Sequence, residues 1–360
     1  MTRLFADDTA LAYSSKNLHD IKQIINYDME QLNLWSNKWL MNFNHKHLGV
    51  IISNNGTWNS HIEHILTNTT KYIATLRKLK YILNRKNLEK IYLVFIRPLF
   101  EYACEVWDNC NITFSNKLEN MQYEAGRIIT GLPIYTKKEF IYRELGWKSL
   151  IDRRRIRKLS MFYNIYHDNA PSFLKSLLPP IVSNFSNYNL RNRNNFQNPY
   201  YRLQITKSSF IPSTSDYWNN LSIETKSSAS IKQFKSLIQP QVTTPSYIKC
   251  FLEYGSRKVN IIHCQLRNRS SSLNYDLFKA HLRDNSTCDC GNDSEDSSHF
   301  LLNCKKFDQS RNIMLQSLDW YNEITVEHLL FGDANLDYNL NIQICRSVQL
   351  FILSSKRFNM

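Results

Sequence analysis

The chain has 360 residues, of which 42% are hydrophobic and 13% aromatic, and this much apolar material excludes an intrinsically disordered protein. Lys and Arg number 45 against 31 Asp and Glu, so the net charge is +14, while Gly is scarce with 8 residues. Neither GxGxxG nor the Walker pattern GxxxxGKS/T occurs, which argues against enzymes built on Gly-rich phosphate loops.

The pattern of apolar residues in the N-terminal segment predicts a small unit with both strand and helix. A strand–turn–strand is expected over residues 3–14, where two apolar runs flank Asp7 and Asp8 at the tip. Apolar side chains recur every three or four positions over residues 17–40, which is typical of an amphipathic helix. Residues 47–52 are expected to form one short strand.

Residues 58–131 are expected to be entirely helical. We assign Tyr72 to the apolar stripe of a first helix and Phe95 to that of a second. Pro98 should kink or interrupt the second helix near its middle, because proline lacks the backbone N–H. A third helix is expected over residues 115–130.

The second half of the chain predicts a less regular organisation. Residues 181–245 are rich in Asn, Ser, Thr and Pro, and we interpret them as a loosely ordered connector. It holds one strand-like run at 200–206 and a short helix near 231–238. The remaining helical segments are expected at 149–178, 257–280 and 324–358.

Positive charge gathers in clusters that suit a polyanion. One run comprises Arg153, Arg154 and Arg155 with Arg157 and Lys158. A basic protein rich in Tyr and Phe fits single-stranded nucleic acid, which offers both charge and flat faces for stacking. The alternative is a solvated helix face, which explains most charge runs.

A Cys/His cluster predicts a metal site. Cys288, Cys290, His299 and Cys304 lie within 17 residues, and Gly291 suits the tight turn after the first pair. Three thiolates and one imidazole form a complete tetrahedral ligand set for zinc, so the ion would be structural rather than catalytic. The alternative is a set of scattered cysteines beside a surface histidine.

The adjacent carboxylates of Asp7 and Asp8 repel one another unless a cation lies between them, and Mg²⁺ is the usual choice. An ordinary acidic turn is the alternative. However, the string Phe5-Ala6-Asp7-Asp8 resembles the palm motif of reverse transcriptases from non-LTR (LINE-type) retrotransposons. Further similarity to that family is found at 39–44, 47–50, 58–62, 101–107, 122–127 and the Cys/His cluster.

The resemblance implies roles for particular residues. Asp7 would be a metal ligand with Asp8 beside it, at a vestigial Mg²⁺ site, and Leu48-Gly49 would belong to the primer grip. The residues expected to contact nucleic acid are Leu48, Gly49, Lys78, Arg85, Arg153, Arg154, Arg155, Arg267 and Arg269.

Departures from the family are equally informative. The family has another essential Asp and template-gripping fingers before the hairpin, and a lysine-bearing hairpin where this chain passes from Asn44 to His45. We therefore expect a truncated, internally deleted remnant of an RNA-directed DNA polymerase, which binds RNA or RNA–DNA duplex without polymerising alone. The alternatives are a nucleic-acid-binding zinc protein that keeps only thumb and knuckle, and an active polymerase with missing upstream exons.

The expected fold is mainly α with a small α+β palm remnant, a helical thumb-like domain, an irregular connector and a C-terminal zinc-knuckle region. The expected domains are 1–52 (palm remnant), 53–180 (thumb-like), 181–255 (connector), 256–310 (basic helix and knuckle) and 311–360 (C-terminal helices). No signal peptide or membrane span is recognisable, so we expect the nucleus or cytoplasm rather than secretion.

Overall fold

A computed structural model describes residues 2–5, 8–11, 17–38, 46–53, 56–185, 193–239 and 255–358, and every structural statement below refers to these. Within them the chain is mainly helical, and its strands form two sheets of two strands each. The predicted predominance of helix is confirmed.

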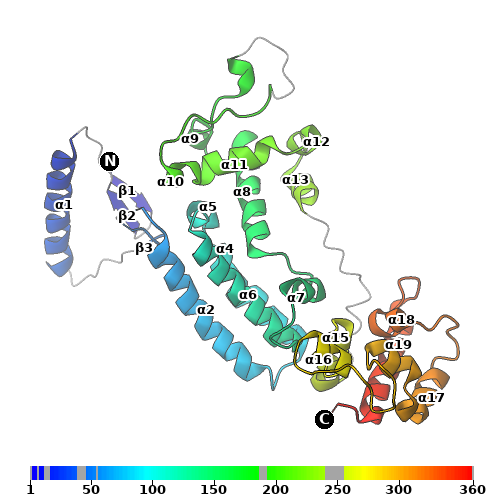
Figure 1. Ribbon diagram of the computed structural model, residues 1–360. Coiled ribbons are helices and arrows are strands. Elements are labelled where there is room, and N and C mark those ends of the chain that lie inside the picture. Colours follow the sequence, from blue (N-terminus) through cyan, green and yellow to red (C-terminus); the bar gives the residue numbers. More distant parts are fainter. Residues whose placement is uncertain are drawn as a thin grey trace.

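The N-terminal hairpin and the helix after it form as predicted. Strands β1 (Thr2–Phe5) and β2 (Asp8–Leu11) pair antiparallel, with Phe5 opposite Asp8. Helix α1 (Leu18–Lys38) follows, and Figure 1 shows it standing apart from the other helices.

The strand predicted at 47–52 is instead a second hairpin. Strands β3 (Lys46–His47) and β4 (Val50–Ile51) pair antiparallel around a turn at Leu48 and Gly49. Both turn residues have positive φ, 48° and 78°, which is the geometry that two-residue hairpin turns require. The sequence did not predict this turn, because it lies within an apolar run and leucine is uncommon at positive φ.

A helical bundle forms the middle of the molecule. Its elements are α2 (Asn59–Leu79), α3 (Arg85–Ile91), the π-helix η1 (Tyr92–Ile96), α4 (Arg97–Glu101), α5 (Cys104–Trp107), α6 (Ile112–Thr130) and α7 (Lys138–Leu145). Helices α2 and α6 pack along their length, as Figure 1 shows, and bury residues such as Ile62, Leu76 and Leu118. The periodic apolar stripes thus determine the core of the bundle.

Pro98 changes the helix type without ending the helix. The chain stays helical from α3 to α4, but η1, which ends two residues before Pro98, has π-helical hydrogen bonding. Because proline offers no N–H to the preceding turn, a wider turn accommodates it. The predicted interruption is therefore a local π-helix.

The segment that we predicted to be a connector follows helix α8 (Leu150–Tyr166) and packs against it. The short elements that follow it are α9 (Ser172–Lys175), η2 (Val182–Asn184), α10 (Gln204–Lys207), α11 (Phe210–Asn219), α12 (Ile223–Lys226) and α13 (Ile231–Ile238).

The prediction of a loosely ordered connector is wrong for residues 193–239. Phe196, Trp218 and Phe234 are buried and pack against Phe162 and Tyr163 of α8. The run expected to be strand-like at 200–206 leads into helix α10, whereas the helix near 231–238 is confirmed.

The C-terminal region forms a separate core beside the bundle. Its elements are α15 (Arg257–Arg267), α16 (Asn274–Lys279), the π-helix η4 (His299–Asn303), η5 (Lys305–Phe307), α17 (Asp308–Gln316), α18 (Val326–Phe331) and α19 (Tyr338–Ser355). Helix α19 packs against α15, α17 and α18, and Phe300 and Phe351 are buried within this core.

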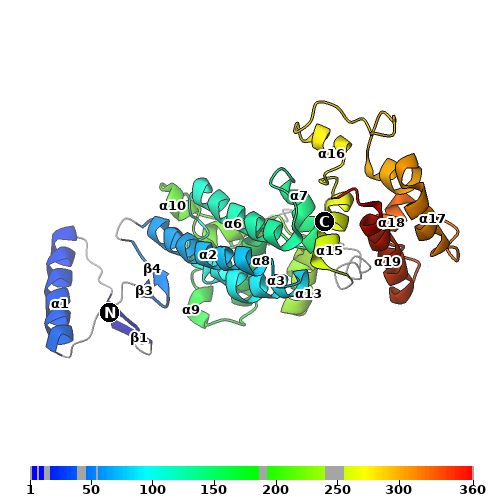
Figure 2. The ribbon, with the colours of Figure 1, turned by 90° about the horizontal axis from the view of Figure 1, so that it is seen from below.

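Helix α15 joins the two cores. The side chain of Arg257 donates to the carbonyls of Ile128 and Ile129 at the end of α6, and Gln265 donates to the Gly131 carbonyl. In Figure 2 the bundle lies between α1 at one end and the C-terminal helices at the other, with α15 at the junction.

Candidate functional site

The four predicted zinc ligands converge at one point. The ligand atoms of Cys288, Cys290, His299 and Cys304 all lie within 4.8 Å of one another. The Sγ atoms of Cys288 and Cys304 are 3.7 Å apart, and Sγ of Cys290 lies 3.2 Å from Nε2 of His299. In tetrahedral zinc, bonds of about 2.3 Å place two sulfur atoms about 3.8 Å apart. The donor set and its spacing fit a four-coordinate zinc ion.

Backbone geometry brings the first two cysteines together. Gly291 has a φ of 91°, and its N–H donates to the Cys288 carbonyl at 2.9 Å. The Cys288 N–H in turn donates to the Asn292 carbonyl at 2.8 Å. This tight turn needs a left-handed residue, which glycine supplies without steric strain.

His299 is the first residue of the π-helix η4, and Cys304 follows its last residue. The Asp296 carboxylate accepts from the N–H of His299 at 2.7 Å, which fixes the start of the helix. The buried Arg311 donates to the Cys304 carbonyl at 2.5 Å and to the Leu301 carbonyl at 3.0 Å. Sequence analysis missed Arg311 as a positioning residue, since nothing local distinguishes it from a surface arginine.

Burial affects the thiols of the cluster. It raises the pKa of Cys288 to about 12 and also raises the pKa of Cys304. Zinc binds thiolates, so metal binding at this cluster would release protons. With four protein ligands the ion would have no position left for water or substrate, and its role would be structural.

Three predicted nucleic-acid contacts are instead internal charges. Arg85 and Arg267 both ion-pair with the buried Glu144, at 2.7 and 2.6 Å. Burial opposes ionisation of Glu144, but the charges of Arg267 and Arg85 hold its pKa well below the usual range. The buried Arg154 pairs with Asp108 at 2.6 Å. The expectation that these three arginines contact phosphate is therefore corrected, because their guanidinium groups neutralise carboxylates inside the protein.

The rest of the basic run on α8 is paired with acidic residues. Arg153 forms an ion pair with Glu101, which lies at the end of α4. Arg155 is half-buried and pairs with Asp152 of its own helix at 3.2 Å. Most of the basic side chains in this cluster therefore form ion pairs with carboxylates, and their charges are neutralised within the protein.

Exposed aromatic rings occur on α2, on η1 and just after α2, and we call them together with the nearby lysines the α2–η1 surface (Lys78, Tyr72, Phe95, Lys80 and Tyr81). Tyr72 and Phe95, assigned from the sequence to the core, are 40% and 54% exposed and stack with ring centroids 6.4 Å apart. Tyr81 is 81% exposed, and Nζ of Lys80 lies 4.8 Å from its ring centroid. Lys78 is exposed on α2. Sequence reasoning misplaced both rings because they lie at the edges of their apolar stripes.

The Leu48-Gly49 turn is fastened to the bundle. The Tyr102 hydroxyl donates to the Leu48 carbonyl at 2.6 Å, and the Ile51 N–H donates to Nδ1 of His61 at 3.3 Å. The turn therefore has a fixed place at the start of α2.

The two hairpins lie next to each other. Strand β2, which begins at Asp8, is beside β3 at the end of the bundle far from the Cys/His cluster (Figure 1). Asp7 and the side chain of Asp8 lie outside the described residues. Arg269 is exposed in the turn after α15, at the other end of the bundle, with φ at 48°.

Comparison with known proteins identifies a class. The chain matches RNA-directed DNA polymerases encoded by transposons, which confirms the predicted relationship to reverse transcriptases of LINE-type elements. No protein-family model matches the chain, and no solved structure is significantly similar to it.

Two curated relatives come from Drosophila melanogaster. The "Probable RNA-directed DNA polymerase from transposon X-element" is 21% identical over 202 residues, which are 47% of this chain and 22% of the relative. The corresponding protein "from transposon BS" is 21% identical over 214 residues, 49% of this chain and 23% of the relative. The matched region thus spans less than a quarter of either relative. Within the described ranges, no helix has the length and apolar character needed to cross a membrane.

Proposed function

We propose that this chain is the thumb and zinc-bearing part of a LINE-type reverse transcriptase, and that it binds RNA or an RNA–DNA duplex. The observation that carries the proposal is the similarity of nearly half of the chain to two transposon RNA-directed DNA polymerases. A net charge of +14 is consistent with a nucleic-acid partner.

The α2–η1 surface supports this proposal. It comprises the stacked pair of Tyr72 and Phe95, the exposed Tyr81 with the Lys80 ammonium over its ring, and the exposed Lys78 of α2. Aromatic rings beside cations are the arrangement on which nucleic acid bases stack while lysines follow the backbone. We assign the main contact to this surface rather than to α8, whose arginines are largely committed to carboxylates.

The proposal gives each predicted metal site a role. Zinc at Cys288, Cys290, His299 and Cys304 would hold the C-terminal core together. Mg²⁺ at Asp7 and Asp8 would be vestigial, because two-metal phosphoryl transfer needs ions clamped by several carboxylates. We therefore propose that the chain by itself does not extend a primer.

Binding is tested with a fluorescein-labelled single-stranded RNA and an RNA–DNA hybrid, by fluorescence anisotropy over a salt series. Tyr81→Ala should weaken RNA binding by about fivefold or more, the lower bound for one lost stacking contact. Lys78→Gln should lower the slope of log affinity against log salt by about 0.7. Lys232→Gln on α13 removes an equal charge elsewhere and should change neither. No measurable binding at low salt would refute the proposed partner.

Catalysis is tested by primer extension on a poly-A template with Mg²⁺ and then Mn²⁺. We expect no extension above an Asp7→Ala control. Extension that disappears in Asp7→Ala would show that the chain assembles an active metal site, contrary to the proposal.

A further inference from the structure

A cavity of about 550 Å³ lies between α7 of the bundle and the C-terminal core, and we call it the α7–α18 cavity. Its walls come from α7, the end of α15 and the turn after it, α16, residues 296–298 and α18. Its volume lies within the range for small-ligand pockets, about 300–1,000 Å³, and suits a ligand of the size of one nucleotide.

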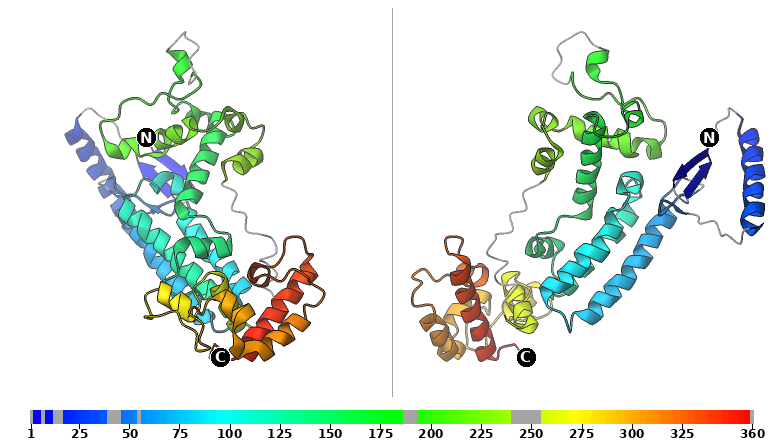
Figure 3. Two further views of the ribbon diagram at one scale, coloured as in Figure 1. Left: turned by 45° about the vertical axis from the view of Figure 1, so that its right-hand side comes forward. Right: turned by 180° about the vertical axis from the view of Figure 1, so that it is seen from behind.

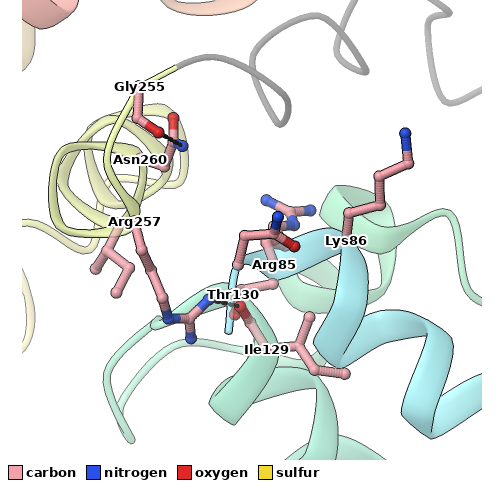
Figure 4. A pocket seen from close by; sticks show the side chains of 9 residues that line it. Arg85, Lys86, Ile129, Thr130, Gly255, Arg257 and Asn260 are labelled. Carbon is pink, nitrogen blue, oxygen red and sulfur yellow. Dashed lines mark hydrogen bonds between the residues drawn. The ribbon is translucent and has the colours of Figure 1, made fainter. Parts of the chain in front are cut away.

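A second cavity, of about 310 Å³, lies beside the start of α15, and Figure 4 shows its lining side chains. Its two arginines are committed to the protein. Arg85 forms an ion pair with Glu144, and Arg257 donates to the carbonyls of Ile128 and Ile129. The α7–α18 cavity differs, because several polar groups of its lining have no partner among the described residues.

The buried acceptor of the α7–α18 cavity is Asp276 on α16, which is 3% exposed. Its Oδ2 atom accepts from the N–H and the hydroxyl of Ser271, at 2.9 and 2.5 Å, which fixes the carboxylate in one orientation. Its Oδ1 atom has no hydrogen-bond partner among the described residues, and protein atoms do not enclose it fully, unlike Nε of Arg85. A donor in the cavity can therefore bind to Oδ1 of Asp276, and pairing would offset the cost of burying this carboxylate.

Hydrogen-bond donors without partners line the same cavity. The hydroxyl groups of Tyr275 and Ser298 form no hydrogen bond within the described residues. Arg143 and Arg269 are exposed and form no ion pair there. Burial raises the pKa of Asp276, and the nearby charge of Arg269 counters that rise, so this guanidinium lies close to the buried carboxylate. The cavity thus offers an acceptor, two hydroxyl donors and two cations to one ligand.

Aromatic rings complete the lining. Phe140 of α7, Tyr275 of α16 and Phe331 of α18 are half-buried and come from three separate elements. The guanidinium of Arg143 lies 5.0 Å from the ring centroid of Phe140. Unpaired bases stack on such rings and on guanidinium planes, so the lining favours a flat, aromatic ligand.

The charges around the cavity nearly cancel. The charged lining residues are three arginines and three carboxylates: Arg143, Arg267, Arg269, Asp276, Asp296 and Glu327. A lining with this balance disfavours a polyphosphate, because the carboxylates would repel several negative charges at short range. One nucleotide within a nucleic acid chain carries a single phosphate charge beside an uncharged base, which matches the balance.

We propose that the α7–α18 cavity binds one unpaired guanine nucleotide of the bound RNA, with Asp276 accepting from the base and Arg143 and Arg269 beside its phosphate. The inference rests on the proposed function and deepens it, since it names the base that the chain would select. Guanine fits because its Watson–Crick edge places two donors, N1–H and the N2 amino group, side by side. The other three bases present one donor group on that edge. Its O6 acceptor can take a hydrogen bond from the hydroxyl of Tyr275 or Ser298, and proteins read unpaired bases along this edge.

The first measurement compares a fluorescein-labelled oligouridine with the same RNA carrying one central guanosine, by fluorescence anisotropy with the full chain. The unmodified chain should bind the guanosine RNA about tenfold more tightly, the order of discrimination that a paired contact to one base provides. Asp276→Asn should bind both RNAs with the affinity that the unmodified chain has for oligouridine. The matched control Asp168→Asn, at an exposed position, should keep the preference. Equal affinities in the unmodified chain, or a preference that persists in Asp276→Asn, would overturn the proposal.

Asp276 also holds the turn at Ser271, so a second measurement leaves the chain unmodified. The central guanosine is replaced by 6-thioguanosine, and irradiation attaches its base to side chains in contact with it. Mass spectrometry of the digested protein should find the adduct within α7, residues 266–276, residues 296–298 or α18. An adduct found only in other segments would overturn the assignment to this cavity.

The same edge is present in a free guanine nucleotide, so a third measurement separates the two sources. The full chain is titrated calorimetrically with guanosine 5′-monophosphate. Binding of this nucleotide combined with equal affinities for the two RNAs would overturn the RNA assignment and leave the free nucleotide as the ligand. If neither RNA binds, the proposed function fails, and the cavity is still tested by Arg143→Gln. This variant should weaken binding of the nucleotide, whereas Arg202→Gln, an exposed arginine elsewhere, should not.

Discussion

Replacing Glu144 by Gln should strongly destabilise the joint between the bundle and the C-terminal core. The Glu144 side chain is 3% exposed and accepts from Arg85 at 2.7 Å, from Arg267 at 2.6 Å and from Asn268 at 3.1 Å. Arg85 lies on α3, Arg267 is the last residue of α15 and Asn268 follows it, whereas Glu144 lies on α7. Figure 3 shows these elements gathered beside the C-terminal helices. Gln is nearly isosteric but leaves two buried guanidinium groups without a counter-ion.

The expected magnitude follows from this geometry. Removing one partner of a buried ion pair typically destabilises a protein by about 3–5 kcal/mol. Because one carboxylate serves two arginines here, we expect a loss near the upper limit, about 5 kcal/mol. The matched control is Asp168→Asn, which breaks the exposed pair with Lys175, whose side chains are 65% and 46% exposed. Such surface pairs contribute less than about 1 kcal/mol.

Urea unfolding of the full chain, followed by tryptophan fluorescence, measures both variants. Glu144→Gln should lower the unfolding midpoint clearly, and Asp168→Asn should leave it near that of the unmodified chain. A triple variant with Glu144→Leu, Arg85→Met and Arg267→Met should recover much of the loss, since replacing the whole buried cluster removes its desolvation penalty. Equal midpoints for Glu144→Gln and Asp168→Asn would refute the assignment of a buried, charged cluster.

Three further outcomes are expected. Because the folded state holds the pKa of Glu144 below its ordinary value of 4.5, its stabilisation is fully present above that value and is lost as the pH falls through the folded pKa. The urea-midpoint difference between the unmodified chain and Glu144→Gln should therefore shrink below about pH 4, and a constant difference would contradict this cause. Elemental analysis should find one zinc ion per chain, and this zinc should be lost in Cys304→Ser. The control Cys110→Ser, which lies outside the cluster, should keep it. Zinc retained by Cys304→Ser would argue against the site. Trp218→Ala should destabilise the chain by about 3–5 kcal/mol because this side chain is buried against α8, whereas the exposed Leu203→Ala should have little effect. Equal thermal midpoints of these last two variants would support the loose connector that the composition predicted.

Local patterns in the sequence determined the features that depend on near neighbours. The period of apolar residues predicted the helices of the bundle and the helix at 231–238, because one face of a helix must be buried. The order Cys288, Cys290, His299 and Cys304 predicted a ligand set, since these residues are close enough along the chain to meet.

Tertiary structure alone decided which arginines are at the surface. The run at Arg153, Arg154 and Arg155 resembles a binding patch in the sequence, yet Glu101 and Asp108, about fifty positions earlier, neutralise two of its members. Glu144 and Arg267 are 123 positions apart and meet only when the bundle and C-terminal core pack together. A local charge pattern contains no information about such distant partners.

The dependence on distant partners also explains why the connector was predicted wrongly. Residues 193–239 are polar on average, so composition predicted little order, but Phe196, Trp218 and Phe234 are far enough apart to escape any local periodicity. They form a core because α8 offers Phe162 and Tyr163 as a common surface. The local sequence determined the helices that have a clear apolar period, whereas the packing of distant aromatic and charged side chains decided which residues remain available to a ligand.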